Sequence, residues 1–296
     1  MTADTSDPET LIRALPIWGG PIDIEPLHGG ITNRNYIVSE KGRRVVVRYG
    51  QDIPEHGVMR FNEFAAAKAA AMAGVSPGVL YASAPFLVME FVAGRSYRAE
   101  DVRRNLHGCV ALMKRVHREV AACLHGPTLC FNVFHVIRNY ARILAGDHSR
   151  KESGLPGYLR ACETLERAVG PIDLVFGHND LLAANFIQDD ARLWLVDWDY
   201  AGWTTPLFDL GGLSSNNGLD RRENDAMLSE YFEKPASDAL WRGFQAMVCA
   251  SLLRESMWSM VSETRSTIAF DYVSYTEENL ERFERAFAAF EEMERS

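Results

Sequence analysis

The apolar residues in the N-terminal part of the chain gather in short runs of strand length. Turn residues such as Gly29-Gly30 and Glu40-Lys41-Gly42 separate the first three runs. A helical segment, residues 58–73, follows them and ends at Gly74, because glycine readily takes the left-handed backbone that closes a helix. We therefore predict a five-stranded, antiparallel sheet with one helix packed on it. The predicted strands are residues 23–27, 35–39, 44–48, 79–82 and 86–91.

The pattern changes after Ala93-Gly94. In residues 99–117 the apolar positions recur at the i, i+3 and i+4 spacing of an amphipathic helix. We therefore predict two lobes, a strand-rich lobe over residues 1–92 and a mostly helical lobe over residues 93–296. The further helices that we expect are residues 131–144, 158–168, 239–260 and 276–293.

One β-hairpin interrupts the helical part of the chain. Its apolar strands, residues 186–187 and 193–196, flank the polar turn Gln188-Asp189-Asp190. Asn185 precedes the first strand and Asp197 follows the second, so the hairpin should hold both side chains at one end. Oxygen-bearing side chains are the ligands that Mg²⁺ prefers, and these two could hold one ion.

The residues around this hairpin have the spacing of a phosphoryl-transfer site. His178, Asp180 and Asn185 follow the pattern H-x-D-x-x-x-x-N of a kinase catalytic loop, with Asp197 after the next strand. Asp180 is our candidate for the group that orients an acceptor hydroxyl and takes its proton. Taken singly, Asp180 could cap a turn and Asp197 could simply end a strand. Their common spacing favours catalysis, with His178 as a structural residue.

A cation is expected at the end of the third strand, where it would contact the phosphates of ATP. Arg48 stands at this point, and arginine forms bidentate pairs with phosphate or carboxylate. Glu63, on the following helix, is its expected partner, and the less favoured alternative is a surface charge on that helix.

Two further segments of the strand-rich lobe are candidates for nucleotide contacts. The Gly29-Gly30 turn, with the side chains of Thr32 and Asn33, could lie over the phosphates, although an ordinary hairpin would look the same. The last strand ends near Glu90 and Val92, where backbone groups would contact adenine. An ordinary strand and linker would also fit that segment.

The composition and net charge of the chain limit the kinds of molecule that the protein is expected to bind. The chain has 296 residues and a formal net charge of −9, which argues against nucleic acid and anionic membrane surfaces. Its five cysteines are scattered and form no C-x-x-C pair, so we expect reduced thiols and no zinc site. The polar N-terminus and the lack of a long apolar run predict neither a signal peptide nor membrane insertion. We therefore expect a cytoplasmic protein.

These motifs together resemble the choline/ethanolamine kinase family, within the wider group of aminoglycoside-phosphotransferase-like kinases. The resemblance covers residues 27–283 and is most specific at residues 178–185 and 196–202, continuing to Phe208-Asp209-Leu210. Arg48 supports it, because choline kinases carry arginine there. The resemblance implies an α+β, bilobal, protein-kinase-like fold that uses ATP and Mg²⁺. It also implies phosphorylation of a small cationic amino alcohol, choline first or ethanolamine, by an enzyme whose relatives are often homodimers.

The resemblance places recognition of the acceptor in two late segments, residues 252–261 and 270–275. These match family segments that supply amine-binding aromatic side chains. Trp258 and Tyr275 are the candidate walls of this pocket, with Tyr272 beside them. Aromatic faces suit a quaternary ammonium, which cannot donate hydrogen bonds. Trp258 could instead be a core residue of an amphipathic helix.

Glu255 departs from the family pattern, in which a second tryptophan is expected. It lies on an apolar helix face, so its carboxylate needs a partner, either a bound cation or an arginine such as Arg254 or Arg265. The departure leaves ethanolamine or another amine open as the acceptor. Asp199 is a second carboxylate expected near the acceptor, and Asp209 is expected to anchor the backbone of the catalytic loop.

Two other functions fit parts of the sequence. Transfer to an aminoglycoside or amino sugar would use the same catalytic residues, but such acceptors carry several ammonium groups and require an open, acidic pocket. An inactive kinase-like binding protein would be expected to lack Asp180, Asn185 or Asp197, and all three are present.

Overall fold

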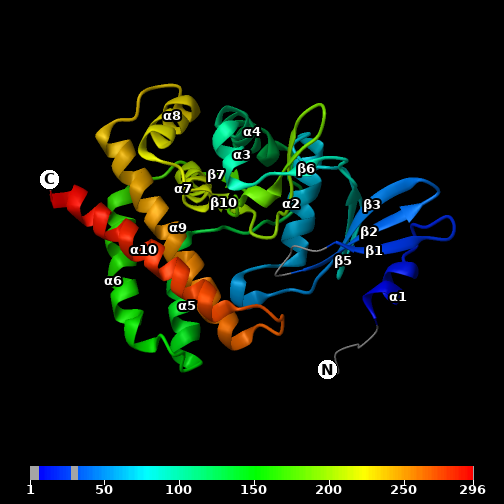
Figure 1. Ribbon diagram of the computed structural model, residues 1–296, viewed down its shortest axis with the longest axis horizontal. Helices are drawn as coiled ribbons and strands as arrows, with labels where there is room; N and C mark the ends of the chain where they lie inside the picture. Colours follow the sequence, from blue (N-terminus) through cyan, green and yellow to red (C-terminus); the bar gives the residue numbers. More distant parts are fainter. Residues whose placement is uncertain (1–6, 28–32, 296) are drawn as a thin grey trace.

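The structure is a computed structural model that describes residues 7–27 and 33–295. The predicted Gly29-Gly30 turn and Thr32 lie outside the described residues. A sheet-containing lobe and a helical lobe lie side by side, with α2 (Arg60–Met72) between them (Figure 1). The predicted bilobal α+β fold is therefore confirmed.

A five-stranded antiparallel sheet makes up most of the N-terminal lobe, with the strand order β1-β2-β3-β5-β4. β3 is the central strand, so Arg48 near its end is flanked by Asn35 of β2 and Leu87 of β5. All five predicted strands are present, each within one residue of its predicted ends. They are β1 (Asp23–Leu27), β2 (Arg34–Glu40), β3 (Arg43–Tyr49), β4 (Val79–Ser83) and β5 (Phe86–Glu90).

The predicted helix over residues 58–73 is α2, and its small side chains let it pack closely. Four of its alanines are buried in a cluster that also contains Leu87 of β5 and Val110 of the helical lobe. Alanine has a high helix propensity and little volume, so the helix can lie against both lobes at once. The buried alanines are Ala66, Ala67, Ala69 and Ala70.

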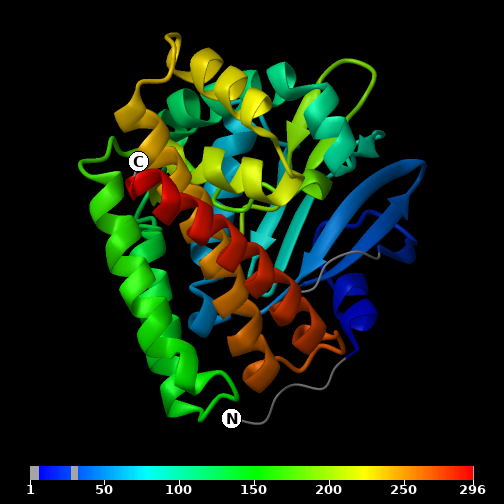
Figure 2. The same cartoon turned by 60° about the vertical axis from the view of Figure 1, so that its left-hand side comes forward.

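The long helix α9 (Asp238–Arg265) is the centre of the helical lobe, where it contacts α5, α6, α7 and α10. Figure 2 shows α10, in red, lying along α9, with α5 and α6 beside them. The remaining α-helices are α1 (Pro8–Arg13), α3 (Ala99–Arg104), α4 (Leu106–Glu119), α5 (Val133–Gly146), α6 (Leu155–Val169), α7 (Pro206–Asn217), α8 (Arg221–Phe232) and α10 (Tyr272–Arg295). Short 3₁₀ turns are η1 (Pro54–His56), η2 (Val120–Cys123), η3 (Glu152–Gly154) and η4 (Ala183–Asn185).

The single helix predicted over residues 99–117 is two helices, α3 and α4. Asn105 separates them with φ −116 and ψ 40, outside the helical region. Its side-chain amide donates a hydrogen bond to the hydroxyl of Tyr97, at 2.8 Å. The apolar spacing continues across the break, which is why the sequence predicted one helix.

The predicted hairpin is present as the antiparallel pair β8 and β9. β6 extends it to three strands, and β7 pairs with β10 in a small separate sheet. These short strands surround the predicted catalytic loop. Their bounds are β6 (Arg95–Ser96), β7 (Val175–Gly177), β8 (Phe186–Gln188), β9 (Leu193–Leu195) and β10 (Gly202–Thr204).

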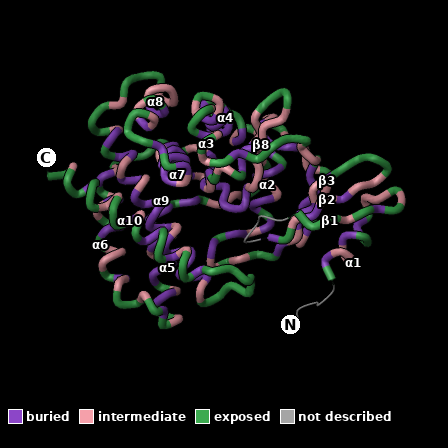
Figure 3. Tube along the Cα trace, in the orientation of Figure 1, coloured by how far each residue is buried: buried purple, intermediate pink, exposed green. Residues whose placement is uncertain are grey.

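Helix α7 was not predicted, because nearly all of its residues are buried (Figure 3). A helix without a polar face shows no amphipathic period in its sequence. Gly211 lies in its middle, and a Cβ atom there would come within 3.0 Å of the backbone of Met247 and Val248 in α9. The close contact between α7 and α9 therefore depends on glycine at this position.

Two other expectations concern the whole chain. All five cysteines are free, as predicted. Among the described residues, no helix combines the length and apolar character needed to cross a membrane.

We expect Gly211→Val to destabilise the protein by about 1–3 kcal/mol, because the added methyl groups must push α7 away from α9. Urea unfolding at neutral pH measures this difference. Gly157→Val in α6 is the matched control, since a Cβ atom there meets only the end of the Arg160 side chain, at 3.9 Å. Equal effects of the two substitutions would contradict the packing argument.

Candidate active site

The carboxylate of Asp209, in the first turn of α7, holds the backbone of the predicted catalytic loop. It accepts hydrogen bonds from the N–H groups of His178 (2.8 Å) and Asn179 (2.6 Å), and from Nε2 of His117 (2.9 Å). Burial acts to raise the pKa of Asp209, but His117 and the loop N–H groups outweigh it and lower the pKa. Asn179 has a left-handed backbone, with φ 66, which a non-glycine residue keeps only where its surroundings hold it.

His178 connects this loop to the end of β9. Its Nε2 donates to the carbonyl oxygen of Val196 at 2.9 Å, and its Nδ1 accepts from the N–H of Asp180 at 3.3 Å. Burial lowers the pKa of His178, so the ring is neutral, with its proton on Nε2. Both ring nitrogens are therefore used in backbone contacts.

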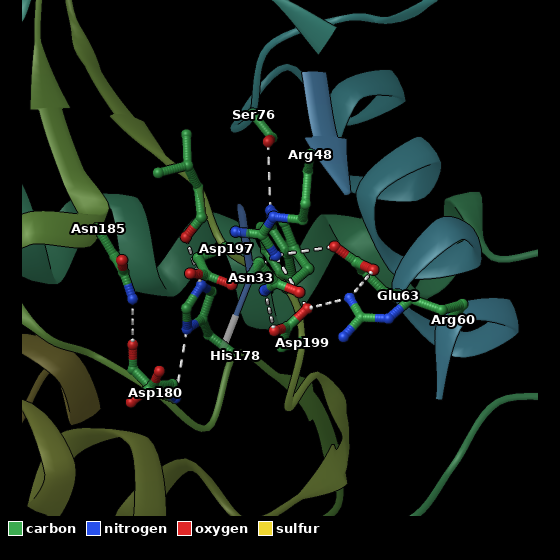
Figure 4. Close-up of polar contacts among 12 residues, drawn as sticks. Asn33, Arg48, Arg60, Glu63, Ser76, His178, Asp180, Asn185, Asp197 and Asp199 are labelled. Atoms are coloured by element: carbon green, nitrogen blue, oxygen red, sulfur yellow. Dashed lines mark hydrogen bonds and ion pairs between the residues drawn. The ribbon is translucent and has the colours of Figure 1, made fainter. Parts of the chain in front are cut away.

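Asn185 and Asp197 lie together at one end of the β8–β9 hairpin. The N–H of Val196 donates to the carbonyl oxygen of Asn185 at 3.0 Å, which closes this end. The side-chain nitrogen of Asn185 donates to the carbonyl oxygen of Asp180 at 2.9 Å, so its amide oxygen points elsewhere (Figure 4). Asp197 has a left-handed backbone, with φ 71, a conformation in which non-glycine residues are strained.

A buried ion cluster joins the two lobes beside this hairpin (Figure 4). Nη1 of Arg48 lies 2.8 Å from the carboxylate of Glu63 and 2.8 Å from that of Asp197. It also lies 2.9 Å from Asp199. Nη1 of Arg60 contacts Glu63 at 2.5 Å and Asp199 at 3.0 Å. The expected contact between Arg48 and Glu63 is thus part of a larger network.

Within this cluster, burial and the neighbouring arginines shift the pKa values of the carboxylates in opposite directions. Burial raises the pKa of Glu63 to about 7, although Arg48 acts to lower it. For Asp199, burial also acts to raise the pKa, but Arg48 and Arg60 outweigh it and the net shift is downward. Guanidinium contacts favour the charged form of such carboxylates, whereas burial favours the neutral form.

A cleft of about 390 Å³ lies between the sheet and the β8–β9 hairpin. Arg48, Asn185 and Asp197 line it on one side, and Glu90 and Val92 line it where β5 ends. Apolar side chains contribute most of the remaining wall, as in sites that bind a flat ring. The cleft is therefore the candidate nucleotide site. Its other lining residues include Leu27, Asn35, Ile37, Val46, Met89 and Val196.

Helix α9 carries another charged pair, whose charges act on Asp180. Nη1 of Arg254 donates to the carboxylate of Glu255 at 2.7 Å, and the hydroxyl of Tyr275 donates to the same carboxylate at 2.8 Å. Burial raises the pKa of Asp180 to about 8, Arg254 opposes this shift, and Glu255 adds to it. A carboxylate with a pKa in this range is suited to accept a proton near neutral pH.

The predicted aromatic side chains pack mainly against one another. Trp258 is only 4% exposed, and its Nε1 donates to the hydroxyl of Tyr200 at 2.8 Å. Tyr272 and Tyr275 meet its ring edge-on, and His56 lies against it with the ring centroids 5.2 Å apart. Trp258 is therefore almost completely buried, and it also lines a cavity of about 260 Å³ together with His56 and Tyr272.

Several residues lie in different surroundings from those predicted. Asp199 is in the ion cluster with Arg48 and Arg60, and the side-chain amide of Asn33 donates to it at 2.7 Å. Arg60 was not predicted, although its place three residues before Glu63 puts the two side chains on one helix face.

Glu255 had several possible partners in the sequence. The structure shows that it pairs with Arg254, because Arg265 pairs with Asp147 instead.

The residues at the end of the hairpin fit a magnesium ion. Asn185 and Asp197 offer an amide oxygen and a carboxylate to the same cleft, which suits a hard cation that takes its other ligands from phosphate and water. No group of three or more His, Cys, Asp or Glu side chains arranged for a metal occurs in the part of the chain that the structure describes. A site with three or four protein ligands, of the kind zinc uses, does not match this arrangement.

Comparison with known proteins gives consistent matches. The phosphotransferase enzyme family matches residues 23–246. Protein LicA of Haemophilus influenzae is 24% identical over 282 residues, covering 90% of this chain and 79% of LicA. Ethanolamine kinase 2 of Mus musculus is 26% identical over 278 residues, covering 83% of this chain and 71% of the mouse protein.

Solved structures show the same fold. A choline/ethanolamine kinase family protein from Mesorhizobium loti superimposes with a TM-score of 0.74 at 25% identity, covering 95% of this chain and 97% of that one. LicA in complex with AMP superimposes with a TM-score of 0.74 at 18% identity, covering 95% and 96% of the two chains. The resemblance drawn from the sequence motifs is thus confirmed.

We expect His56 to make the folded protein sensitive to acid. Burial lowers its pKa to about 3, whereas the unfolded chain has the ordinary value of about 6.5. Between these pH values the unfolded state binds more protons, so stability falls as the pH falls through this window. The loss attributable to His56 should reach about 2 kcal/mol at pH 5 relative to pH 7.

Urea unfolding of the wild type and of His56→Gln at pH 7 and pH 5 tests this. Glutamine can still bond to the hydroxyls of Tyr140 and Ser262, which contact the two ring nitrogens of His56. The variant should lose less stability on acidification by about the stated amount. The same pH dependence in both proteins would show that His56 does not titrate in this range.

Proposed function

The chain belongs to the phosphotransferase enzyme family, and we propose that it transfers the γ-phosphate of ATP, with Mg²⁺, to the hydroxyl of a small cationic amino alcohol such as choline or ethanolamine. One observation carries this proposal. A half-buried carboxylate, Asp180, adjoins two candidate magnesium ligands, Asn185 and Asp197, at the end of a cleft that can hold a nucleotide. The amino-alcohol acceptor is proposed because Ethanolamine kinase 2 and the choline/ethanolamine kinase family protein are among its relatives.

The nucleotide would lie in the 390 Å³ cleft, with adenine near Glu90 and Val92 and the phosphates near Arg48. Arg48 contacts three carboxylates, and phosphate oxygens would compete for the same guanidinium. Arg60 stays in contact with Glu63 in either case, so that carboxylate keeps a partner when Arg48 turns to phosphate. Asn185 and Asp197 would hold a magnesium ion, whose charge would offset the negative charge that develops during transfer.

In the proposed transfer, the acceptor oxygen forms a bond to the γ-phosphorus as the bond from that phosphorus to the β,γ-bridging oxygen breaks. ADP leaves, and the proton of the acceptor hydroxyl passes to the carboxylate of Asp180. The contacts of Asp209 and His178 with the loop hold Asp180 in place while this happens. Asn185 contributes twice, since its nitrogen orients the loop at Asp180 and its oxygen is free to hold the metal.

Aminoglycoside transfer is the alternative within the same family. An aminoglycoside carries several ammonium groups and requires an open, acidic acceptor side. The described acceptor side instead contains the guanidinium of Arg254 and the buried ring of Trp258. These features favour a single small cation.

We expect Asp180→Asn to lower kcat by at least about 10²-fold, because the amide cannot take the acceptor proton. ADP release with ethanolamine and choline as acceptors measures this. Asp190→Asn, at the exposed tip of the β8–β9 hairpin, is the matched control and should act like the wild type. Full activity of Asp180→Asn with every amine tested would refute the assignment.

We expect Asp197→Asn to raise the Mg²⁺ concentration needed for half-maximal rate by at least about tenfold, because a charged ligand becomes neutral. Titration of the rate with MgCl₂ at saturating nucleotide measures this, and calorimetry of ADP binding with and without Mg²⁺ gives a second readout. An unchanged Mg²⁺ requirement would exclude Asp197 as a ligand.

A further inference from the structure

The pair formed by Arg254 and Glu255 connects to the catalytic loop through Tyr200, whose carbonyl oxygen accepts a hydrogen bond from the side chain of Asn179, the residue before Asp180. The guanidinium of Arg254 lies over the ring of Tyr200, 4.4 Å from its centroid. Nε and Nη2 of Arg254 have no hydrogen-bond acceptor among the described residues, so this contact with an aromatic face is what compensates them. Arg254 is thus the more buried member of the pair, with a side chain only 6% exposed.

Glu255 itself is the accessible member of the pair, with a side chain 18% exposed. One oxygen accepts from Arg254 and the other from the hydroxyl of Tyr275. Burial and the charge of Glu255 raise the pKa of Tyr275, which therefore stays protonated and donates. A carboxylate has about four lone-pair sites, so roughly two remain for a ligand.

Two of the aromatic rings around this pair already have a partner against one face. Arg254 covers Tyr200, and His56 lies against Trp258, which is almost completely buried. A trimethylammonium group in this place would gain little from the rings and would lie near the guanidinium of Arg254. An ammonium that keeps N–H groups would instead form charge-assisted hydrogen bonds with Glu255.

We propose that the Arg254–Glu255 pair selects acceptors whose ammonium group carries at least one N–H, and so disfavours choline. This inference rests on the proposed transfer to an amino alcohol. In the bound state, the ammonium donates to the free lone pairs of Glu255 while the hydroxyl faces Asp180. Arg254 and Tyr275 act as positioning residues, because they orient the carboxylate through the contacts already described.

Methylation of the acceptor nitrogen tests the proposal directly. Initial rates would be measured with the full chain, Mg-ATP, and ethanolamine, N-methylethanolamine, N,N-dimethylethanolamine or choline. We expect kcat/KM to fall by at least about tenfold between the dimethyl compound and choline, since the last N–H is lost at that step. The earlier methylations should have smaller effects because one N–H remains.

Glu255→Gln separates recognition from folding. The amide oxygen can still accept a hydrogen bond from Arg254 or Tyr275, but the charge is gone. We expect its KM for ethanolamine to rise by about tenfold or more, and we expect a smaller rise with choline, which has no N–H to donate to Glu255. Asp238→Asn, at the exposed start of the same helix, is the matched control and should keep the wild-type preference.

Three results would overturn the inference, and they can be told apart. A wild-type preference for choline refutes the selection while the proposed function stands. Equal losses of Glu255→Gln with all four acceptors would mean that Glu255 acts only on the fold, which thermal unfolding would confirm. No transfer to any of the four amines would remove both the inference and the proposed function.

Discussion

The buried ion cluster around Arg48 is the constraint on which the arrangement of the two lobes depends. Charges placed in the interior are strongly destabilising unless oppositely charged groups contact them. Arg48 comes from the sheet, Arg60 and Glu63 come from α2, and Asp197 and Asp199 follow β9. The sheet, the helix between the lobes and the catalytic hairpin must therefore meet at one point. Arg48 and Asp197 also line the candidate nucleotide cleft. The charges that hold the two lobes together are therefore the same ones that we propose to contact the nucleotide and its metal.

A second set of contacts holds the reacting side of the cleft. Asp209 binds the backbone of the catalytic loop, and α7, which carries Asp209, packs on α9 through Gly211. Arg254 and Glu255, which we propose to face the acceptor, are part of that same α9. One continuous helix thus supports the loop through α7 and also carries this pair. Rigid support of this kind keeps reacting groups in the geometry that transfer requires.

The two sides of Asp180 differ in chemistry in a way that suits a kinase for small cations. On the nucleotide side, the cleft has guanidinium and metal-ligand groups that match phosphate. On the other side, a carboxylate stands in front of an arginine that neutralises part of its charge. In the proposed function, Glu255 therefore offers hydrogen bonds to a cation, while Arg254 weakens the negative field that would attract a polycation. The same fold could accept a different alcohol if these few side chains changed.

Much of the molecule could be read from the sequence because its signals are local. The strands of the N-terminal sheet, the β8–β9 hairpin, and the order of His178, Asp180 and Asn185 depend on neighbours in the chain. The sequence therefore determined the fold class and the type of reaction. It missed α7, since a fully buried helix has no polar face to reveal its period.

What only the tertiary structure decided are the partners of charged residues distant in sequence. Asp199 was expected near the acceptor but contacts Arg48, 151 residues away. Trp258 was expected to line a cation pocket but is buried against His56. Glu255 had two arginines as possible partners, and its neighbour Arg254 remained because Arg265 is held by the distant Asp147. Such choices depend on distances through space, which the spacing of residues along a chain does not specify.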